Sequence, residues 1–212
     1  MQLYERYRPQ TFDDFIGQQK IIKQVRALLQ RPTWDRDALW FQGPSGTGKT
    51  TLAWIIARQL IQSDFAVIEY DGDEINKGLM ETIKHDLYLA PMGGGWKVYI
   101  VNEAHAMTRQ AVQVWLTLLE RLPENRLVVF TTTEDISDDL FGDFGHPLMS
   151  RCKVFKFTNQ GLAQDMAARA RRIAQDEQLD GKPESAYLNL VRDCKNNMRH
   201  VLQRIDAGEM LV

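Results

Sequence analysis

The chain has 212 residues, which at about 150 residues per domain allows one domain with a small appendage and excludes a large multidomain machine. Hydrophobic residues make up 44% and charged residues 25% of it, a globular composition that excludes a disordered chain. The formal net charge is −2, so any binding to a polyanion must depend on a local basic face or on backbone amides.

The first predicted elements are a helix, a strand and a second helix. Apolar residues three and four apart predict a helix at Ile21–Leu29, which Pro32 ends. The apolar run Ala38–Phe41 predicts a strand, and Thr50–Leu60 predicts a buried helix. Because the glycine-rich segment Gly43–Gly48 lies between them, we expect a tight loop from strand to helix.

The middle of the chain continues this alternation of strands and helices. Strands alternating with helices are typical of a parallel sheet that is covered on both faces, so the predicted fold class is α/β. In chain order the pattern predicts the strand Ala66–Tyr70, the helix Leu79–Leu87, the strand Val98–Val101, the helix Ala111–Leu119, and the strands Leu127–Thr131 and Val154–Phe157.

After Thr158 the pattern predicts helices alone. We therefore expect two domains, an α/β nucleotide-binding domain at residues 1–157 and a small helical domain at residues 158–212. The helices of the second domain are predicted, with no strand between them, at Leu162–Ala174, Ser185–Val191 and Met198–Ile205.

Cysteine content and apolar run length predict the compartment. Cys152 and Cys194 are too few for a disulfide scaffold or a four-thiolate zinc site and suit a reducing interior. The N-terminal MQLYERYRPQ does not resemble a signal peptide, and no segment approaches the roughly 20 apolar residues of a membrane span. We therefore expect a cytoplasmic protein.

The strongest motif is Gly43-Pro44-Ser45-Gly46-Thr47-Gly48-Lys49-Thr50, a full G-x-x-x-x-G-K-[ST] pattern between a predicted strand and a predicted helix. Its glycines let backbone N–H groups converge on phosphate oxygens at the positive end of the helix. Lys49 is expected to reach the outer phosphates of ATP, and the Thr50 hydroxyl to ligate Mg²⁺. A turn that binds nothing would have no use for Lys-Thr at this place.

The segment Lys97–His105 ends a predicted strand in polar residues that can reach the phosphate site. It resembles a Walker B motif in which Asn102 replaces the usual aspartate, so we expect weaker Mg²⁺ binding. Asn102→Asp should then raise turnover or lower the Mg²⁺ requirement. Glu103 remains as the carboxylate that orients or deprotonates the attacking water. The alternative is that both residues only end a strand.

Together these motifs resemble the AAA+ ATPases, and more closely their clamp-loader branch, the replication factor C small subunits and the bacterial gamma/tau subunits. The resemblance spans the chain from about Tyr4 to about Ala207. Tyr7–Gln18 resembles the family's N-terminal box, which lies against the adenine, and this implies that Arg8 and Ile16 contact the base. The segment that holds the zinc module of gamma/tau subunits has no cysteine here, so replication factor C is the closer match.

Ser150-Arg151-Cys152 matches the family's Ser-Arg-Cys motif, whose arginine reaches the nucleotide of the next subunit. The resemblance therefore implies that Arg151 is an arginine finger in trans and that the chain works in a homo- or hetero-oligomer. After the helical domain no residues remain for the collar that joins clamp-loader pentamers. Assembly would then depend on AAA+ contacts alone, on a partner, or on further chain outside this sequence.

Two more segments resemble the family's sensors. Leu127–Glu134 resembles the sensor 1 strand, which implies that Thr133, or alternatively Thr132, lies beside the terminal phosphate. Asn197-Met198-Arg199 resembles the start of the sensor 2 helix, which implies that Arg199 contacts the phosphates from the helical lid of the same chain. The alternative for Arg199 is a helix-capping or surface role.

The predicted function is ATP-dependent loading or remodelling, on DNA, of a sliding clamp or a related replication or repair complex. Two alternatives stay open: a structural subunit that binds ATP but hydrolyses it weakly, and an AAA+ loader for a helicase or transposase. The candidate DNA-backbone contacts are Lys77, Lys84 and Arg109. The acidic part, Asp135–Asp143, of the predicted surface loop Asp135–His146 should face away from DNA.

The predicted site has three groups of residues. The predicted catalytic residues are Glu103, Arg151 and Thr133, and the predicted metal ligands are Thr50 and Asn102. The predicted nucleotide-binding residues are Arg8, Ile16, Gly43, Pro44, Ser45, Gly46, Thr47, Gly48, Lys49, Thr50, Thr51 and Arg199.

Overall fold

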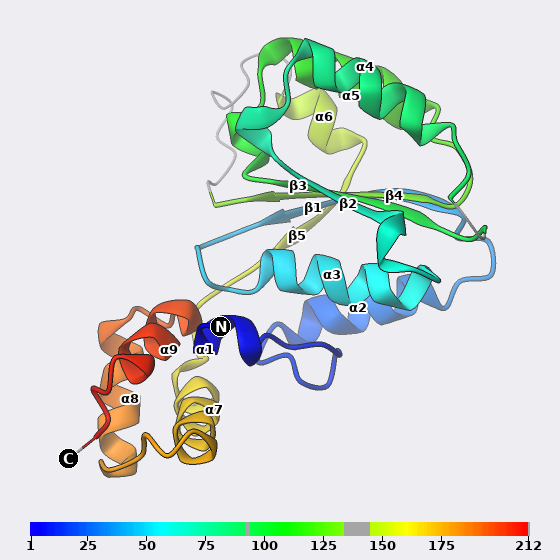
Figure 1. Cartoon of the computed structure of the whole chain (residues 1–212). Coiled ribbons are helices and arrows are strands. Elements are labelled where there is room, and N and C mark those ends of the chain that lie inside the picture. Colours follow the sequence, from blue (N-terminus) through cyan, green and yellow to red (C-terminus); the bar gives the residue numbers. More distant parts are fainter. Residues whose placement is uncertain (92–93, 134–144, 212) are drawn as a thin grey trace.

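The computed structural model describes residues 1–91, 94–133 and 145–211, which form a sheet-containing body and a smaller helical body (Figure 1). Residues 135–144 of the predicted acidic loop lie outside the described part. Within the described residues, no helix is both long enough and apolar enough to cross a bilayer.

The central sheet is parallel throughout, with the strand order β2-β3-β4-β1-β5. This confirms the predicted α/β class. Because neighbouring strands run the same way, the carboxyl ends of β1, β3 and β4 meet at one edge, where ligands bind in open parallel sheets. The strands are β1 Arg36–Gln42, β2 Val67–Asp71, β3 Lys97–Asn102, β4 Arg126–Thr132 and β5 Lys153–Lys156.

Helices cover the two faces of the sheet (Figure 1). On one face lie α2 (Gln19–Leu29) and α3 (Lys49–Leu60), and on the other lie α4 (Lys77–Leu87), α5 (Arg109–Glu120) and α6 (Gly145–Ser150). Short 3-10 turns, η1, η2 and η3, occupy Asp64–Ala66, Gly72–Glu74 and Ala104–Ala106. The short helix α6, which precedes β5, was not predicted from the sequence.

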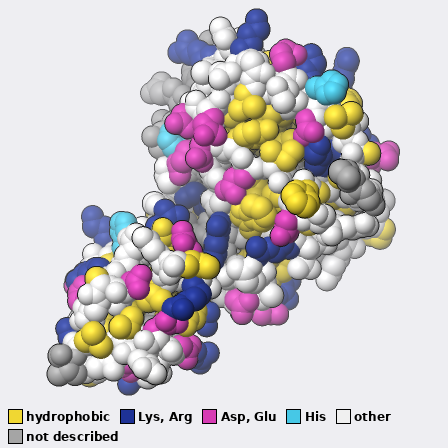
Figure 2. Space-filling view, in the orientation of Figure 1, with side chains coloured by type: hydrophobic (Ala, Val, Ile, Leu, Met, Phe, Trp, Pro, Cys, Tyr) yellow, Lys and Arg dark blue, Asp and Glu magenta, His cyan; other side chains and the backbone are white. Residues whose placement is uncertain are grey.

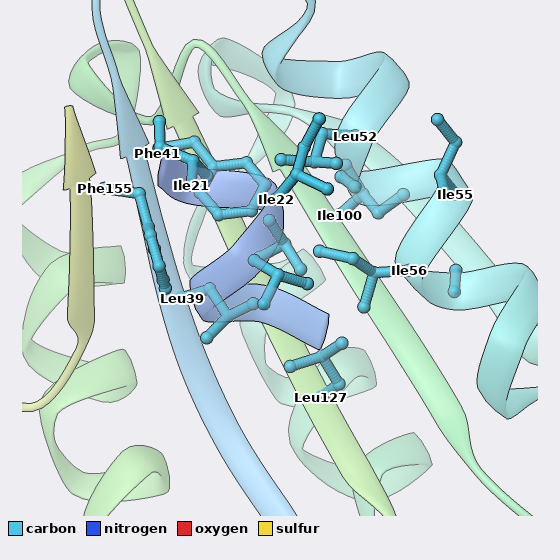
Figure 3. Packing of buried hydrophobic residues seen from close by; sticks show 14 of the residues in the cluster. Ile21, Ile22, Leu39, Phe41, Leu52, Ile55, Ile56, Ile100, Leu127 and Phe155 are labelled. Atoms are coloured by element: carbon cyan, nitrogen blue, oxygen red, sulfur yellow. The ribbon is translucent and has the colours of Figure 1, made fainter. Parts of the chain in front are cut away.

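Each face of the sheet has its own hydrophobic core. Side chains alternate along a strand, so Leu39 and Phe41 of β1 pack with α2 and α3, whereas Trp40 between them packs on the other face. Figure 3 shows the first of these cores, where Leu52 and Ile56 of α3 lie over the sheet. Burial on both faces explains why the central strands appear in the sequence as continuous apolar runs.

The helical body is formed by α7 (Ala163–Asp176), α8 (Glu184–Asp193) and α9 (Met198–Asp206), which share a third core. The first helix, α1 (Leu3–Arg6), was not predicted and joins this core through the buried Leu3. The Tyr7 hydroxyl also donates a hydrogen bond to Glu177 at the end of α7. The N-terminal residues therefore lie against the helical body, and the domain division at residue 157 stays a prediction.

Candidate functional site

A cavity of about 680 Å³ opens between the carboxyl edge of the sheet, the N-terminal segment and the start of α9. The predicted residues that line it are Arg8, Ile16, Ser45, Gly46, Thr47, Gly48, Lys49, Thr50, Thr51, Glu103, Thr133 and Arg199. Gly43, Pro44 and Asn102 lie behind this lining, in hydrogen bonds to Lys49 and Thr50. Arg151 is not among the lining residues.

Two glycines of the loop between β1 and α3 are required by both conformation and space. Gly46 has φ +77° and Gly48 has φ +92°, values that side chains disfavour. A Cβ at Gly48 would lie 2.4 Å from the Phe15 ring, and one at Gly46 would lie 2.1 Å from the Asn197 side chain, the N-cap of α9. The loop backbone is thus pressed between the N-terminal segment and the helical body.

Lys49 begins α3 and is only 6% exposed. Its ammonium group donates hydrogen bonds to the carbonyl oxygens of Gly43 at 2.7 Å and Pro44 at 3.0 Å. Burial lowers the pKa of Lys49 to about 8; nearby Glu103 opposes this shift, and the positive charge of Arg199 adds to it. The folded protein therefore holds a partly desolvated cation at the cavity wall.

Two arginines from distant parts of the sequence face the same cavity. The Arg8 Nε donates a hydrogen bond to the Thr51 hydroxyl at 3.1 Å, and burial lowers the pKa of Arg8. Arg199, in the first turn of α9, lies with its guanidinium 5.6 Å from the centre of the Tyr4 ring. Figure 2 shows Lys and Arg side chains at the narrow junction of the two bodies.

The polar residues at the ends of β3 and β4 meet beside the loop. The Thr50 hydroxyl donates to Asn102 Oδ1 at 2.8 Å, which suits a hard cation because the lone pairs of the hydroxyl oxygen stay available. These oxygen donors fit Mg²⁺, which typically takes one or two protein ligands and completes its shell with phosphates and water. No group of three or more His, Cys, Asp or Glu residues in the described ranges could hold a metal by itself.

Glu103 follows β3 in the left-handed backbone region, with φ +44°. Thr133 donates a hydrogen bond to its carboxylate at 3.0 Å and also lines the cavity. The Thr132 hydroxyl instead lies 3.1 Å from His105 Nδ1. Of the two threonines considered for the sensor position, the geometry therefore favours Thr133, and its role stays a prediction.

Arg151 lies away from the cavity, between α6 and β5. It forms an ion pair with Glu120 at the end of α5, and its guanidinium donates to the Pro147 carbonyl at 2.8 Å. Within one chain it therefore contacts its own surface, and a role in a neighbouring site stays a prediction.

The three candidate DNA contacts lie on the surface of α4 and α5. Lys77 and Arg109 are the exposed first residues of these helices, and Lys84 pairs with Glu81 at 3.7 Å. Their contact with DNA stays a prediction.

Apart from Ile16, the apolar part of the cavity lining was not predicted from the sequence. It comes from Tyr4, Phe15, Met166, Met198 and Leu202, which belong to the N-terminal segment, α7 and α9. Apolar residues at helical spacing normally indicate a core. Most of these residues pack in or against the third core and also line the cavity. Only the packing of the two bodies shows that they face a cavity.

Comparison with known proteins gives the family. A family model described as DNA polymerase III, delta subunit, matches residues 59–161. The replication factor C small subunit of Haloarcula marismortui is 30% identical over 212 residues, covering 97% of this chain and 62% of that protein. Over nearly its whole length the chain is therefore similar to clamp-loader subunits. The DNA polymerase III subunit tau of Bacillus subtilis is also similar, at 31% identity over 97% of this chain and 39% of that protein.

A solved structure is similar to this chain in fold. The Thermotoga maritima RuvB Holliday junction branch migration motor matches with a TM-score of 0.70 and 22% identity, over 94% of this chain and 64% of that chain. At this identity the match shows the fold alone. The chain spans 62% and 39% of the lengths of the two similar sequences.

The buried Lys49 predicts an unusual stability change. In the protein without nucleotide, measured in EDTA, Lys49→Met should raise the free energy of unfolding at pH 7 by on the order of 1 kcal/mol, because it removes a desolvated charge. The folded pKa of about 8 lies below the ordinary 10.5, so the penalty is complete below pH 8 and disappears as the pH rises toward 10.5. Thermal unfolding should therefore show a clearly larger gain at pH 7 than at pH 10. A variant less stable than the wild type at pH 7 would contradict the assignment.

Proposed function

We propose that the chain is an ATP-dependent AAA+ subunit of the clamp-loader type, which loads or remodels a sliding clamp or a related replication or repair complex on DNA. The observation that carries this proposal is the convergence of Lys49, Arg8 and Arg199 on one cavity beside a P-loop. Burial lowers the pKa of Lys49 and of Arg8, and the positive charge of Arg199 lowers both further, so Arg199 repels each of the other two cations. A nucleoside triphosphate relieves that repulsion, since its phosphates carry several negative charges.

The residues around the loop suit ATP hydrolysis. Lys49 would exchange its two carbonyl partners for the outer phosphates, and Glu103, held by Thr133, would orient the attacking water. Bound Mg²⁺ would supply positive charge to the phosphate oxygens and would be held by Thr50. Asn102 would accept the hydrogen bond that the Thr50 hydroxyl donates. The apolar lining around Ile16 gives the base a surface to pack on.

Nucleotide binding would also join the two bodies. Arg8 and Arg199 reach the cavity from the N-terminal segment and from α9, while Lys49 belongs to the sheet-containing body. A ligand that contacts all three favours one angle between the bodies, so loss of the terminal phosphate would change that preference. This supplies the coupling between nucleotide state and shape that a loader needs.

Assembly would complete the site. The ion pair of Arg151 with Glu120 is solvent-exposed, and such pairs are weak, so a polyphosphate in an adjoining subunit can compete for the guanidinium. We propose homo- or hetero-oligomers in which Arg151 stabilises charge in the neighbour's site, with DNA and a clamp or another replication protein as partners. The free thiols of Cys152 and Cys194 suit the cytoplasm as the place of action.

A second candidate function is favoured by Asn102 alone. Because this residue replaces a carboxylate near the metal position, the chain could act as an ATP-binding structural subunit with little turnover of its own. Steady-state hydrolysis in the assembled state separates the two functions.

Lys49 is the first test of the proposed site. Lys49→Ala should abolish measurable ATP binding in isothermal calorimetry, because it removes the cation nearest the loop that cradles the phosphates. Arg151→Ala is the matched control, since Arg151 lies outside the chain's own cavity, and it should bind ATP like the wild type. Wild-type affinity in the Lys49 variant would refute the assignment.

The second test concerns the arginine finger. Arg151→Ala should reduce turnover in the assembled protein by about 10³-fold, the lower range for such fingers, with little change in nucleotide affinity. Mixing it with Glu103→Gln protein should restore part of the activity, because an intact finger of one subunit then faces an intact site of another. Full activity of Arg151→Ala alone, or failure of the mixture to exceed either variant, would show that the finger does not act in trans.

A further inference from the structure

The side-chain amide of Asn102 has a defined orientation. Its Oδ1 accepts hydrogen bonds from the Thr50 hydroxyl at 2.8 Å and from the Thr131 hydroxyl at 3.2 Å, and its Nδ2 donates to the Glu69 carboxylate. An ionised carboxylate only accepts hydrogen bonds, so Glu69 forces the NH₂ of the amide toward itself. The oxygen must then face Thr50, the residue predicted to ligate the metal.

Glu69 is itself held in place from α3. It lies in β2, next to β3 in the sheet, and its second carboxylate oxygen accepts a hydrogen bond from Trp54 Nε1 at 2.8 Å. Thr50 and Trp54 are four residues apart on α3 and so lie on one side of the helix. The chain Thr50–Asn102–Glu69–Trp54 is therefore closed into a ring by one turn of α3.

We propose that Glu69 is a positioning residue that lets Asn102 replace the missing Walker B aspartate. The Glu69 carboxylate holds the Asn102 amide so that its oxygen accepts the hydrogen bond from the Thr50 hydroxyl. The lone pairs of that hydroxyl then stay available to the metal. It also supplies, one side chain farther away, the negative charge that Asn102 does not carry. The inference rests on the proposed ATP site and names a residue from a strand that carries none of the site's motifs.

This arrangement reverses the expectation from the sequence that Asn102→Asp would improve the site. An aspartate at position 102 would place a second carboxylate in hydrogen-bonding contact with Glu69, and two carboxylates in contact repel each other. One of the two would have to turn away, and the acceptor for Thr50 would be lost or strained. Exchanging the two groups in the double variant Glu69→Gln/Asn102→Asp instead keeps one charge and one amide, because the introduced glutamine amide can donate to the introduced aspartate carboxylate.

The test is the increase in ATP affinity that Mg²⁺ produces, measured by calorimetry in EDTA and again in Mg²⁺. Glu69→Gln should reduce the Mg²⁺-dependent increase about tenfold, the size typical of lost second-layer contacts at metal sites. Because the Glu69 carboxylate also raises the pKa of Arg8, each variant's affinity in Mg²⁺ is compared with its own affinity in EDTA. Asn102→Asp alone should also reduce it, and the double variant should return to the wild-type increase. Glu74→Gln, which removes a nearby carboxylate in η2, is the matched control and should behave as the wild type.

The outcomes separate this inference from the proposed function. A wild type that binds no ATP in either buffer refutes both. Normal ATP binding with an unchanged Mg²⁺-dependent increase in Glu69→Gln overturns the role of Glu69 alone, as does an Asn102→Asp variant that equals or exceeds the double variant. If Glu69→Gln fails to fold, judged by circular dichroism, Trp54→Phe removes only the second hydrogen bond of Glu69 and should still lower the Mg²⁺-dependent increase; no change there overturns the proposal.

Discussion

The arrangement of the cavity depends on one lysine ammonium group that is almost fully buried. Lys49 begins α3 at the carboxyl edge of a parallel sheet, where it is held by two backbone carbonyls and repelled by Arg199. Burying such a charge is unfavourable unless strong partners surround it. In the proposed function, a polyanionic ligand in the adjoining cavity would offset that cost.

The N-terminal segment connects the helical body to the sheet-containing body. It packs α1 into the core of the helical body, passes the cavity at Arg8 and Phe15, and only then enters α2 beneath the sheet. The close approach of Gly46 to Asn197 brings the helical body directly onto the P-loop. Under the proposed function, a ligand bound in this cavity would contact both bodies and so would favour one angle between them.

The site departs from the usual P-loop arrangement at one residue and adjusts in its surroundings. Replacing an aspartate by Asn102 removes charge but adds a donor, and the neighbouring strand provides Glu69 as the acceptor for it. In the proposed ATP site, the negative charge therefore lies one side chain farther out, on Glu69, while Asn102 still accepts the hydrogen bond from Thr50. Such an exchange between neighbouring strands is possible because parallel strands place their carboxyl-terminal side chains next to one another.

The sequence by itself determined the elements and their class. Continuous apolar runs such as Val98–Val101 and the helical spacing of Thr50–Leu60 report burial locally, and the P-loop pattern carries its own geometry because its glycines are needed for specific backbone conformations. The order of strands and helices then left the parallel sheet as the natural arrangement, and the structure has it.

Only the tertiary structure decided which side chains meet. Three contacts illustrate this: Thr133 with Glu103, Arg151 with Glu120, and Glu69 with Asn102. Their partners are 30, 31 and 33 positions apart in the sequence. No local pattern marks these pairs, because periodicity reports which face of an element is buried and says nothing about which neighbouring element lies against it. That information arises when the helices pack on the twisted sheet and the helical body closes on the P-loop, which brings distant polar groups within hydrogen-bonding distance.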